Sequence, residues 1–365
     1  MGQGALTGLR VVEMAGIGPG PFCAMMLADH GADVLRVERP GQSWPLPIGP
    51  RIDPLNRGRA VVTLDLRTDA DRDALLRLID RADALIEGFR PGVMEKLGFG
   101  PDALLARNPR LVYGRMTGWG QDGPLARTAG HDLNYAGLTG AIAAMGPADR
   151  PPPPPLNLVA DFGGGAMMLA FGMLAALLEA RTSGRGQVVD AAMVDGTSLL
   201  MTMFHGLRAV GGWSERRDDN LLDGGAPFYA CYQTADGGHL SVCPLEPPFF
   251  AALLDRLGLA DDPDFQAQYD RGTWPGMRGR LAAIFRSRTR DAWAEHFAGS
   301  DACVAPVLTM EEAPAHPQAH DRGGFVERGG ILQPQAAPRL SRTPAAAGGS
   351  PAEIGRDEAL AVWGA

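Results

Sequence analysis

The amino-acid sequence predicts an α/β protein, with a Rossmann-like large domain built on a parallel sheet and a smaller α+β domain after it. Short β-rich runs alternate with helical segments over about the first 200 residues, which is typical of a parallel sheet covered on both faces. Glycines follow the first apolar run directly, as in dinucleotide-binding folds. The length of 365 residues also allows two domains with cores of their own.

Six strands and the helices between them account for the large domain. Residues 69–79 are expected to form a helix, because Ala74, Leu75, Leu78 and Ile79 recur at helical spacing. The strands are expected at residues 10–12, 33–37, 61–65, 84–87, 111–116 and 187–191.

The second half of the chain predicts a smaller domain between two linkers. The sequence FYACYQTADGGHLSVCPLE predicts a hairpin with its turn at Asp236–Gly238, and helices are expected at 248–257 and 278–297. From Ala313 the chain is rich in proline, alanine and glycine, without a clear period until Pro351. We therefore expect a large domain at 1–210 completed by a C-terminal tail at 330–365, a small domain at 225–325, and linkers at 211–224 and 313–338.

The glycines after the first strand do not complete a dinucleotide fingerprint. Pro21 stands where G-x-G-x-x-G requires its third glycine, and Pro19 and Pro21 lack the backbone N–H groups that would point at a pyrophosphate. Glu38 occupies the position of a ribose-binding carboxylate, but the next residue, Arg39, suits a phosphate better. The pattern favours a βαβ unit over an NAD site.

Composition argues against several other classes of function. The net charge of −8 argues against nucleic acid or an anionic membrane as a partner. The longest apolar run, residues 166–178, is too short to span a bilayer and is expected to be a buried core helix. Four cysteines without a C-x-x-C pair fit a cytoplasmic location and argue against zinc or disulfides. The one lysine, Lys96, reads as an exposed helix end, which argues against a pyridoxal-phosphate enzyme.

Motifs for metal, serine-hydrolase and nucleotide sites are also missing. His316 and His320 have the i, i+4 spacing of metal ligands, but Pro317 in a proline-rich stretch argues against a helix there, so no metal site is expected. The sequence contains neither a G-x-S-x-G elbow nor a G-x-x-x-x-G-K-[ST] loop.

Two segments carry candidate acid–base groups. One is TAGHDLNYAGLTG, which contains His131, and the other is LNLVADFGGG, in which Asp161 precedes three glycines at the start of a helix. Asp161 could be a helix N-cap. Three glycines, however, cost a helix about 1 kcal/mol each relative to alanine and would expose backbone to a close ligand. Both explanations are open at this point.

Several longer motifs carry a resemblance to a known family. They are LTGLRVVEMAGIGPGPFCAMMLADHGADVLRVERP, EGFRPGVMEKLG, YGRMTGWGQDGP, AGHDLNYAGLTG, LNLVADFGGG, GQVVDAAMVDG and LLDGGAPFYACYQTADG, with SDACVAPVL and PRLSRTP nearer the C-terminus. With them the chain resembles the 2-methylacyl-CoA racemase branch of the family III CoA-transferase (CaiB/BaiF) superfamily. The resemblance implies an interlocked homodimer that binds coenzyme A thioesters instead of NAD, with coenzyme A entering as part of the substrate and no other cofactor.

The resemblance also implies roles for particular residues. Asp161 matches the aspartate that forms an acyl anhydride in the transferases, His131 matches the added histidine of the racemases, and Glu246 matches a supporting carboxylate. Eight basic residues could neutralise the phosphates of coenzyme A, although a solvated surface position explains most of them: Arg36, Arg39, Arg51, Arg57, Arg59, Arg67, Arg90 and Lys96. The residues that the resemblance assigns to substrate or coenzyme A are Arg39, Leu64, Asp65, Leu66, Arg67, Gly88, Phe89, Arg90, Lys96, Gly130, Asp132, Leu133, Asn134, Tyr135 and Asn157.

These roles fit proton transfer at the carbon next to a thioester. Racemisation through an enolate needs one unprotonated and one protonated group on opposite faces of C2. Histidine suits the first role and an aspartic acid with a raised pKa suits the second, while the glycine-rich helix start could stabilise the enolate oxygen. The alternatives are CoA transfer through an acyl anhydride on Asp161, and a CoA-thioester-binding protein without activity.

Overall fold

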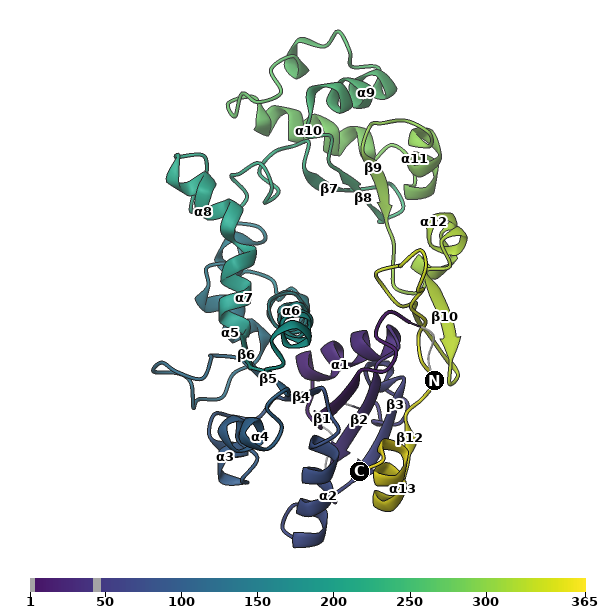
Figure 1. Cartoon of the computed structure of the whole chain (residues 1–365). Coiled ribbons are helices and arrows are strands. Elements are labelled where there is room, and N and C mark those ends of the chain that lie inside the picture. The colour runs from purple at the N-terminus through teal and green to yellow at the C-terminus, as the bar shows by residue number, and fades with distance from the viewer. Residues whose placement is uncertain (1–3, 42–46) are drawn as a thin grey trace. The chain divides into compact units, whose positions relative to one another are not determined.

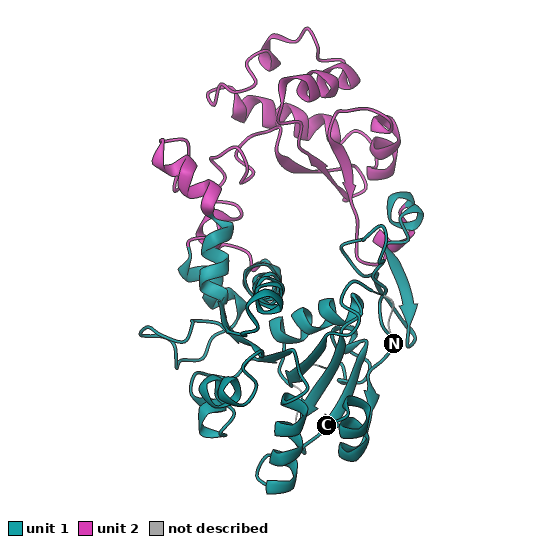
Figure 2. Cartoon of the chain, viewed as in Figure 1, with its two compact units in different colours: residues 1–139, 155–201, 317–365 teal, residues 140–154, 202–316 magenta. Residues whose placement is uncertain are grey.

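The computed structural model describes residues 4–41 and 47–365 and divides the chain into two compact units (Figure 2). Unit 1 consists of Met1–Thr139, Pro155–Met201 and Pro317–Ala365, and unit 2 of Gly140–Pro154 and Thr202–His316. Each unit has its own sheet and core. The chain therefore leaves unit 1 twice and returns to it twice.

A seven-stranded parallel sheet forms the centre of unit 1 (Figure 1). Its order, β12-β3-β2-β1-β4-β5-β6, contains the doubly wound order 3-2-1-4-5-6, which reverses direction between β1 and β4. The predicted α/β fold class is confirmed. The strands are β1 Arg10–Met14, β2 Asp33–Glu38, β3 Arg59–Thr63, β4 Ala84–Glu87, β5 Val112–Thr117, β6 Val188–Ala192 and β12 Ala352–Glu353.

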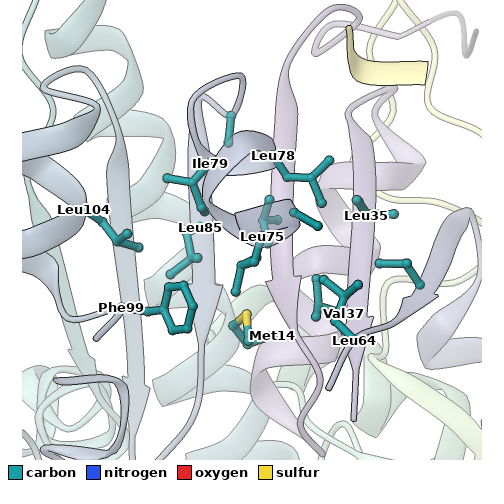
Figure 3. Packing of buried hydrophobic residues seen from close by; sticks show 14 of the residues in the cluster. Met14, Leu35, Val37, Leu64, Leu75, Leu78, Ile79, Leu85, Phe99 and Leu104 are labelled. Carbon is teal, nitrogen blue, oxygen red and sulfur yellow. The ribbon is translucent and has the colours of Figure 1, made fainter. Parts of the chain in front are cut away.

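One face of this sheet is covered by four helices around an apolar core (Figure 3). Leu75 and Leu78 of α2 are fully buried and lie among strand residues such as Leu35 and Leu85. The hydroxyl of Thr68 accepts the N–H of Asp71 and so caps the first turn of α2. The helices on this face are α2 Asp69–Ile79, α3 Val93–Lys96, α4 Pro101–Arg107 and α13 Arg356–Trp363.

The opposite face is covered by α1 (Pro19–Asp29) and α6 (Met168–Ser183), and it buries charge as well as apolar groups. Glu13 of β1 forms ion pairs with Arg36 of β2 and with Arg59 of β3, and all three side chains are inaccessible to solvent. Arg57 is likewise buried, against Asp29 at 2.5 Å. The interpretation of these three arginines as solvated surface residues is therefore wrong.

The apolar helix of unit 1 is longer than the run of residues 166–178. The π-helix η3 (Leu158–Met167) continues into α6, and together they cover Leu158–Ser183, long and apolar enough to cross a bilayer, as core helices of soluble proteins also are. Burial is also less complete than the sequence predicted, because Phe171 and Leu178 are 74% and 70% exposed. Unit 1 also contains η1 Pro54–Asn56, α5 Asp132–Leu138, α7 Met193–Leu200 and α12 Pro317–Asp321.

Unit 2 combines a three-stranded antiparallel sheet with helices around an aromatic core that includes Phe228, Trp274 and Phe285. The predicted hairpin is confirmed as β7 paired with β8. The single helix expected at 278–297 is two helices, because Thr289 caps a new first turn by accepting the N–H of Ala292. The elements are η2 Ile142–Ala144, α8 Thr202–Ala209, β7 Ala230–Gln233, β8 His239–Val242, α9 Pro247–Leu257, η4 Pro263–Phe265, α10 Trp274–Phe285, α11 Arg290–Phe297, β9 Val304–Val307 and η5 Ala313–Ala315.

The segment expected to be a second linker has regular structure. It contains α12 (Pro317–Asp321) and an antiparallel hairpin of β10 (Phe325–Arg328) and β11 (Ile331–Pro334). Two glycines with positive φ, at 329 and 330, form the two-residue turn that such hairpins favour. The guanidinium of Arg57 donates to the side chain of Gln333 at 2.9 Å and thereby anchors the hairpin within unit 1.

The C-terminal helix fixes the tail to the main sheet of unit 1. Trp363 is 2% exposed, and its indole N–H donates to Asp33 at 2.8 Å. The backbone carbonyl of Trp363 accepts a bond from Arg10 at 3.0 Å. Both partners lie on the first two strands, so the last turn of the chain closes contacts with residues more than 300 positions earlier.

We expect Trp363→Ala to lower the free energy of unfolding of unit 1 by about 3–5 kcal/mol, because it leaves a cavity and removes the bond to Asp33. Val362→Ala is the matched control, since Val362 is 61% exposed and should change stability by less than about 0.5 kcal/mol. Urea unfolding followed by fluorescence measures both. Equal midpoints for the two variants would contradict the anchoring role of the tail.

Candidate active site

Most of the residues assigned from the sequence lie in loops at one edge of the parallel sheet. Arg39 follows β2, residues 64–67 follow β3, residues 88–90 follow β4 and His131 lies beyond β5. The carboxyl ends of parallel strands meet at the same edge, which is where doubly wound folds bind their ligands. The fold therefore brings these loops together on unit 1.

Asp161 lies inside η3, four residues after its N-cap position at Asn157. The side chain that caps this helix belongs to Asp132, whose Oδ1 accepts the N–H groups of Ala160 at 2.8 Å and of Asp161 at 2.7 Å. The explanation of Asp161 as an N-cap is therefore wrong. Because Asp132 takes the capping role, the carboxylate of Asp161 is available for other contacts.

The carboxylate of Asp161 lies in a confined, partly buried position. Its Oδ2 accepts a weak bond from the Asn157 amide at 3.4 Å. Gly18, in the turn after β1, has φ +68°, and a Cβ on it would lie 3.1 Å from the same oxygen. Burial raises the pKa of Asp161 to about 6; the Asn157 bond opposes this rise, the charge of Asp132 adds to it, and that of His131 opposes it.

Helix packing explains the glycines after Asp161. A Cβ on Gly164 would lie 2.5 Å from Thr197 Oγ1, and a Cβ on Gly165 would lie 2.8 Å from Met193 Cγ. Both contacts are with α7, whose Gly196 in turn meets the backbone of Gly164. The expectation that this triplet exposes its backbone to a ligand is wrong for Gly164 and Gly165, which are buried.

His131 stands at the start of α5, immediately before Asp132. Its backbone N–H donates to the side chain of Asn134 at 3.1 Å, and its imidazole is exposed. The hydroxyl of Tyr135 donates to the carbonyl of Gly130, and the Tyr135 ring packs edge-on against Trp119 with 4.7 Å between centroids. These contacts fix the backbone on both sides of His131. Leu133 and Asn134 are exposed on the same first turn.

The loops assigned to coenzyme A differ in what their side chains contact. Arg67 is largely exposed, and its guanidinium donates to both oxygens of Asp65, at 2.8 and 2.7 Å. Leu64 is 1% exposed and belongs to the core, whereas Leu66 is half-buried. The exposed members of the assigned set on the remaining loops are Arg39, Gly88 and Arg90, and Phe89 is half-buried. Lys96 is also exposed and is the last residue of α3.

Glu246 belongs to unit 2, whereas the residues above belong to unit 1. It stands at the N-terminus of α9, its side chain is exposed, and its carbonyl accepts the N–H of Phe250 at 3.0 Å. Its predicted role beside His131 stays a prediction.

Two residues with a place in this region were not singled out from the sequence. Gly18 packs against Asp161, and its signal was the glycine run after β1. Glu87, the last residue of β4, is 1% exposed and accepts the N–H of Phe89 at 2.7 Å. Its signal was a carboxylate directly after an apolar strand, in the motif EGFRPG. Over residues 4–41 and 47–365, no group of three histidine, cysteine or acidic side chains could hold a metal ion.

Comparisons with known proteins show the family and the fold of the chain. The sequence pattern of CoA-transferase family III matches residues 6–358. The chain is 47% identical to an α-methylacyl-CoA racemase of Mus musculus over 93% of its own length and 87% of the relative, and 44% identical to that of Homo sapiens over 93% and 88%. A crystal structure of a CAIB/BAIF family protein from Brucella suis superposes with a TM-score of 0.81 at 27% identity and covers 99% of this chain and 98% of its own.

We expect Asp161→Asn to stabilise unit 1 at neutral pH, because the pKa of the buried carboxyl is raised from 3.8 to about 6. Folding favours the protonated form of Asp161 in the wild-type protein. The contribution of this carboxyl to the free energy of unfolding is therefore complete below about pH 4 and is lost as the pH rises through 6. Above pH 6 the free energy of unfolding of Asp161→Asn should exceed that of the wild type by about 1–2 kcal/mol, after allowance for the partial exposure of the side chain.

Urea unfolding between pH 4 and 8 tests this, with Asp122→Asn, an exposed carboxylate of the same unit, as the control. A stability difference that is largest at pH 4 would contradict a raised pKa.

Proposed function

The chain belongs to CoA-transferase family III, and from this premise we propose that it is an isomerase that racemises 2-methylacyl-CoA thioesters at C2. The observation that carries the proposal is the placement of two proton-transfer groups, His131 and Asp161, on adjoining helices of unit 1. Identity of 44% and 47% to proteins named α-methylacyl-CoA racemase supports the same reaction.

In this reaction one side chain takes the C2 proton from one face of the substrate. The electrons of the broken C–H bond move into the thioester carbonyl, which gives a planar enolate, and the second side chain returns a proton to the opposite face. An imidazole accepts a proton near neutral pH. Asp161, with a pKa of about 6, is close enough to neutrality to act both as the acid and as its conjugate base.

Coenzyme A enters this proposal as part of the substrate, without a separate cofactor. Its phosphates need cations, and the exposed Arg39, Arg67, Arg90 and Lys96 supply them around the carboxyl edge of the sheet of an otherwise acidic chain. The thioester end then lies towards His131 and Asp161. Gly130, Asp132, Tyr135 and the other assigned residues around these two hold the shape of that end.

We propose further that two copies of the chain form an interlocked homodimer. On α6, Phe171, Leu174 and Leu178 are exposed along one helical stripe, and a second copy would cover them. Glu246 of one copy then supports the imidazole of His131 of the other. We also propose a cytoplasmic location, which the four free cysteines support. The proposed 2-methylacyl-CoA substrate is the basis for proposing a role in fatty-acid metabolism.

A second candidate reaction is CoA transfer between a thioester and a free acid. It is favoured by the name of the family and by the carboxylate of Asp161, which makes only one weak bond among the described residues and could attack a thioester to form an anhydride. That reaction has no use for His131, so we place racemisation first.

Incubation of a single 2-methylacyl-CoA epimer in heavy water is expected to give both epimers, with deuterium at C2, because the enolate is reprotonated from solvent-exchanged groups. NMR spectroscopy and chiral chromatography measure the label and the epimer ratio. CoA transfer predicts instead that new thioester forms only when an acceptor acid is added, and that hydroxylamine traps an acyl group on Asp161. Failure to exchange across several branched acyl-CoAs would exclude racemisation.

We expect His131→Ala to slow deuterium exchange from one epimer by about 10²–10⁴-fold while the other epimer keeps some exchange through Asp161. Asp161→Asn should show the opposite bias, and Glu246→Gln should slow both directions. Sedimentation and circular dichroism establish that each variant keeps its fold and oligomeric state. Equal residual exchange from both epimers in His131→Ala would rule out a division of the two faces between these residues.

A further inference from the structure

A buried carboxylate supports the loop after β4. Glu87 is the last residue of that strand, on the sheet face that α3 and α4 cover, and its Oε2 accepts the backbone N–H of Phe89 at 2.7 Å. This bond spans the turn at Gly88, which connects β4 to Arg90. The other oxygen, Oε1, accepts Nε of Arg115 at 3.2 Å.

Arg115 divides its guanidinium between two carboxylates with different surroundings. Its Nη2 donates to Glu95 of α3 at 2.8 Å, and the Glu95 side chain is 43% exposed, whereas that of Glu87 is 2% exposed. Of these two carboxylates, Glu87 accepts the loop amide of Phe89. The pair therefore provides a comparison: both carboxylates bind the same arginine, and one of them also holds the loop.

The loop that Glu87 holds lies at the carboxyl edge of the parallel sheet, together with the other loops of the candidate active site. Arg90 is exposed, and its charge acts on the hydroxyl of Tyr135, which lies on the helix that His131 begins. A guanidinium positioned there is suited to the phosphates of coenzyme A. The position of the Arg90 guanidinium depends on the backbone conformation of Gly88–Arg90. Without the bond to Glu87, the glycine in this loop would allow many conformations.

We propose that Glu87 is a positioning residue for the acyl-CoA substrate, whose bond to the Phe89 amide keeps the Gly88–Arg90 loop in the conformation that presents Arg90 to coenzyme A. This inference rests on the proposed function, because it takes coenzyme A as the ligand of the loop. It assigns no contact between Glu87 and the reacting atoms.

The ionisation of Glu87 makes this role dependent on pH. Burial raises its pKa to about 7; the Phe89 amide and Arg115 oppose the rise, and the charge of Glu95 adds to it. Tyr113 of β5 also faces the carboxylate of Glu87, and its hydroxyl donates to the backbone carbonyl of Phe99. An ionised carboxylate forms bonds roughly twice as strong as a neutral acid, so protonation loosens the loop.

The size of the effect follows from the fraction of molecules with an ionised Glu87. With a pKa of about 7, this fraction falls from roughly 0.9 at pH 8 to roughly 0.1 at pH 6. If the ionised form alone binds coenzyme A well, the apparent Kd rises by up to about tenfold over the same range.

Calorimetric titration of free coenzyme A into wild type, Glu87→Gln and Glu95→Gln at pH 6, 7 and 8 tests the proposal. Wild type should lose affinity towards pH 6. Glu95→Gln should keep this loss with its midpoint at a lower pH, because the charge of Glu95 contributes to the raised pKa of Glu87. Glu87→Gln should bind weakly at pH 8 with most of the pH dependence removed. The phosphates of coenzyme A also titrate in this pH range, but they do so equally with all three proteins, so differences between the proteins do not come from the ligand. In turnover, Glu87→Gln should raise KM and leave kcat near that of wild type. A wild-type pH dependence in Glu87→Gln, or its loss in Glu95→Gln, would overturn the proposal.

The Phe89 amide provides a readout that needs no ligand. Its nitrogen and proton chemical shifts in the wild-type protein should change with a midpoint near pH 7, and this change should be absent in Glu87→Gln. Coenzyme A binding without an amide transition overturns the role of Glu87 and leaves the proposed function intact. An amide transition without binding of any CoA compound overturns the proposed function, and with it coenzyme A as the ligand of this loop.

Discussion

The buried carboxylate of Glu13 is the interaction on which the geometry of unit 1 most depends. Two arginines from neighbouring strands, Arg36 and Arg59, form ion pairs with it, and each also donates to a backbone carbonyl of the segment after β1, at Gly16 and Pro21. Loss of one member of such a pair leaves an uncompensated buried charge, at about 3–5 kcal/mol. The pairs thus fix the segment that carries Gly18, and Gly18 limits the space around Asp161.

A second buried network lies on the other face of the same sheet. Glu87 and Arg115 occupy the carboxyl ends of β4 and β5, and they support the turn between β4 and α3 in the way that the Glu13 pairs support the turn between β1 and α1. The two turns flank the point where the strand order reverses. The ion pairs buried on each face of the sheet therefore stabilise loops at its carboxyl edge. The apolar core holds the helices against the sheet.

Local patterns in the sequence predicted β1 to β6, the β7–β8 hairpin and α2, because alternation and helical spacing depend on neighbouring residues. They did not predict β9 to β12. The capping of η3 could not be predicted in this way, since Asp132 acts on an N–H group 29 positions later, at Asp161. The sequence predicted Arg36 and Arg59 to be surface cations, because the carboxylate that both of them bind, Glu13, belongs to another strand. The motifs singled out His131 and Asp161, and family resemblance supplied their roles and added Glu246. The packing of Gly164 on α7 and the burial of Glu87 needed the three-dimensional structure.

The pairing of β12 with β3 has a consequence for synthesis on the ribosome. β12 contributes Ala352 and Glu353 beside Ala60 and Val61, so the edge of β3 stays open until these two residues have been made. An open, apolar strand edge is a template for pairing with other chains. The nascent protein must therefore keep this edge apart from other chains while all of unit 2 emerges, because β12 follows unit 2 in the sequence.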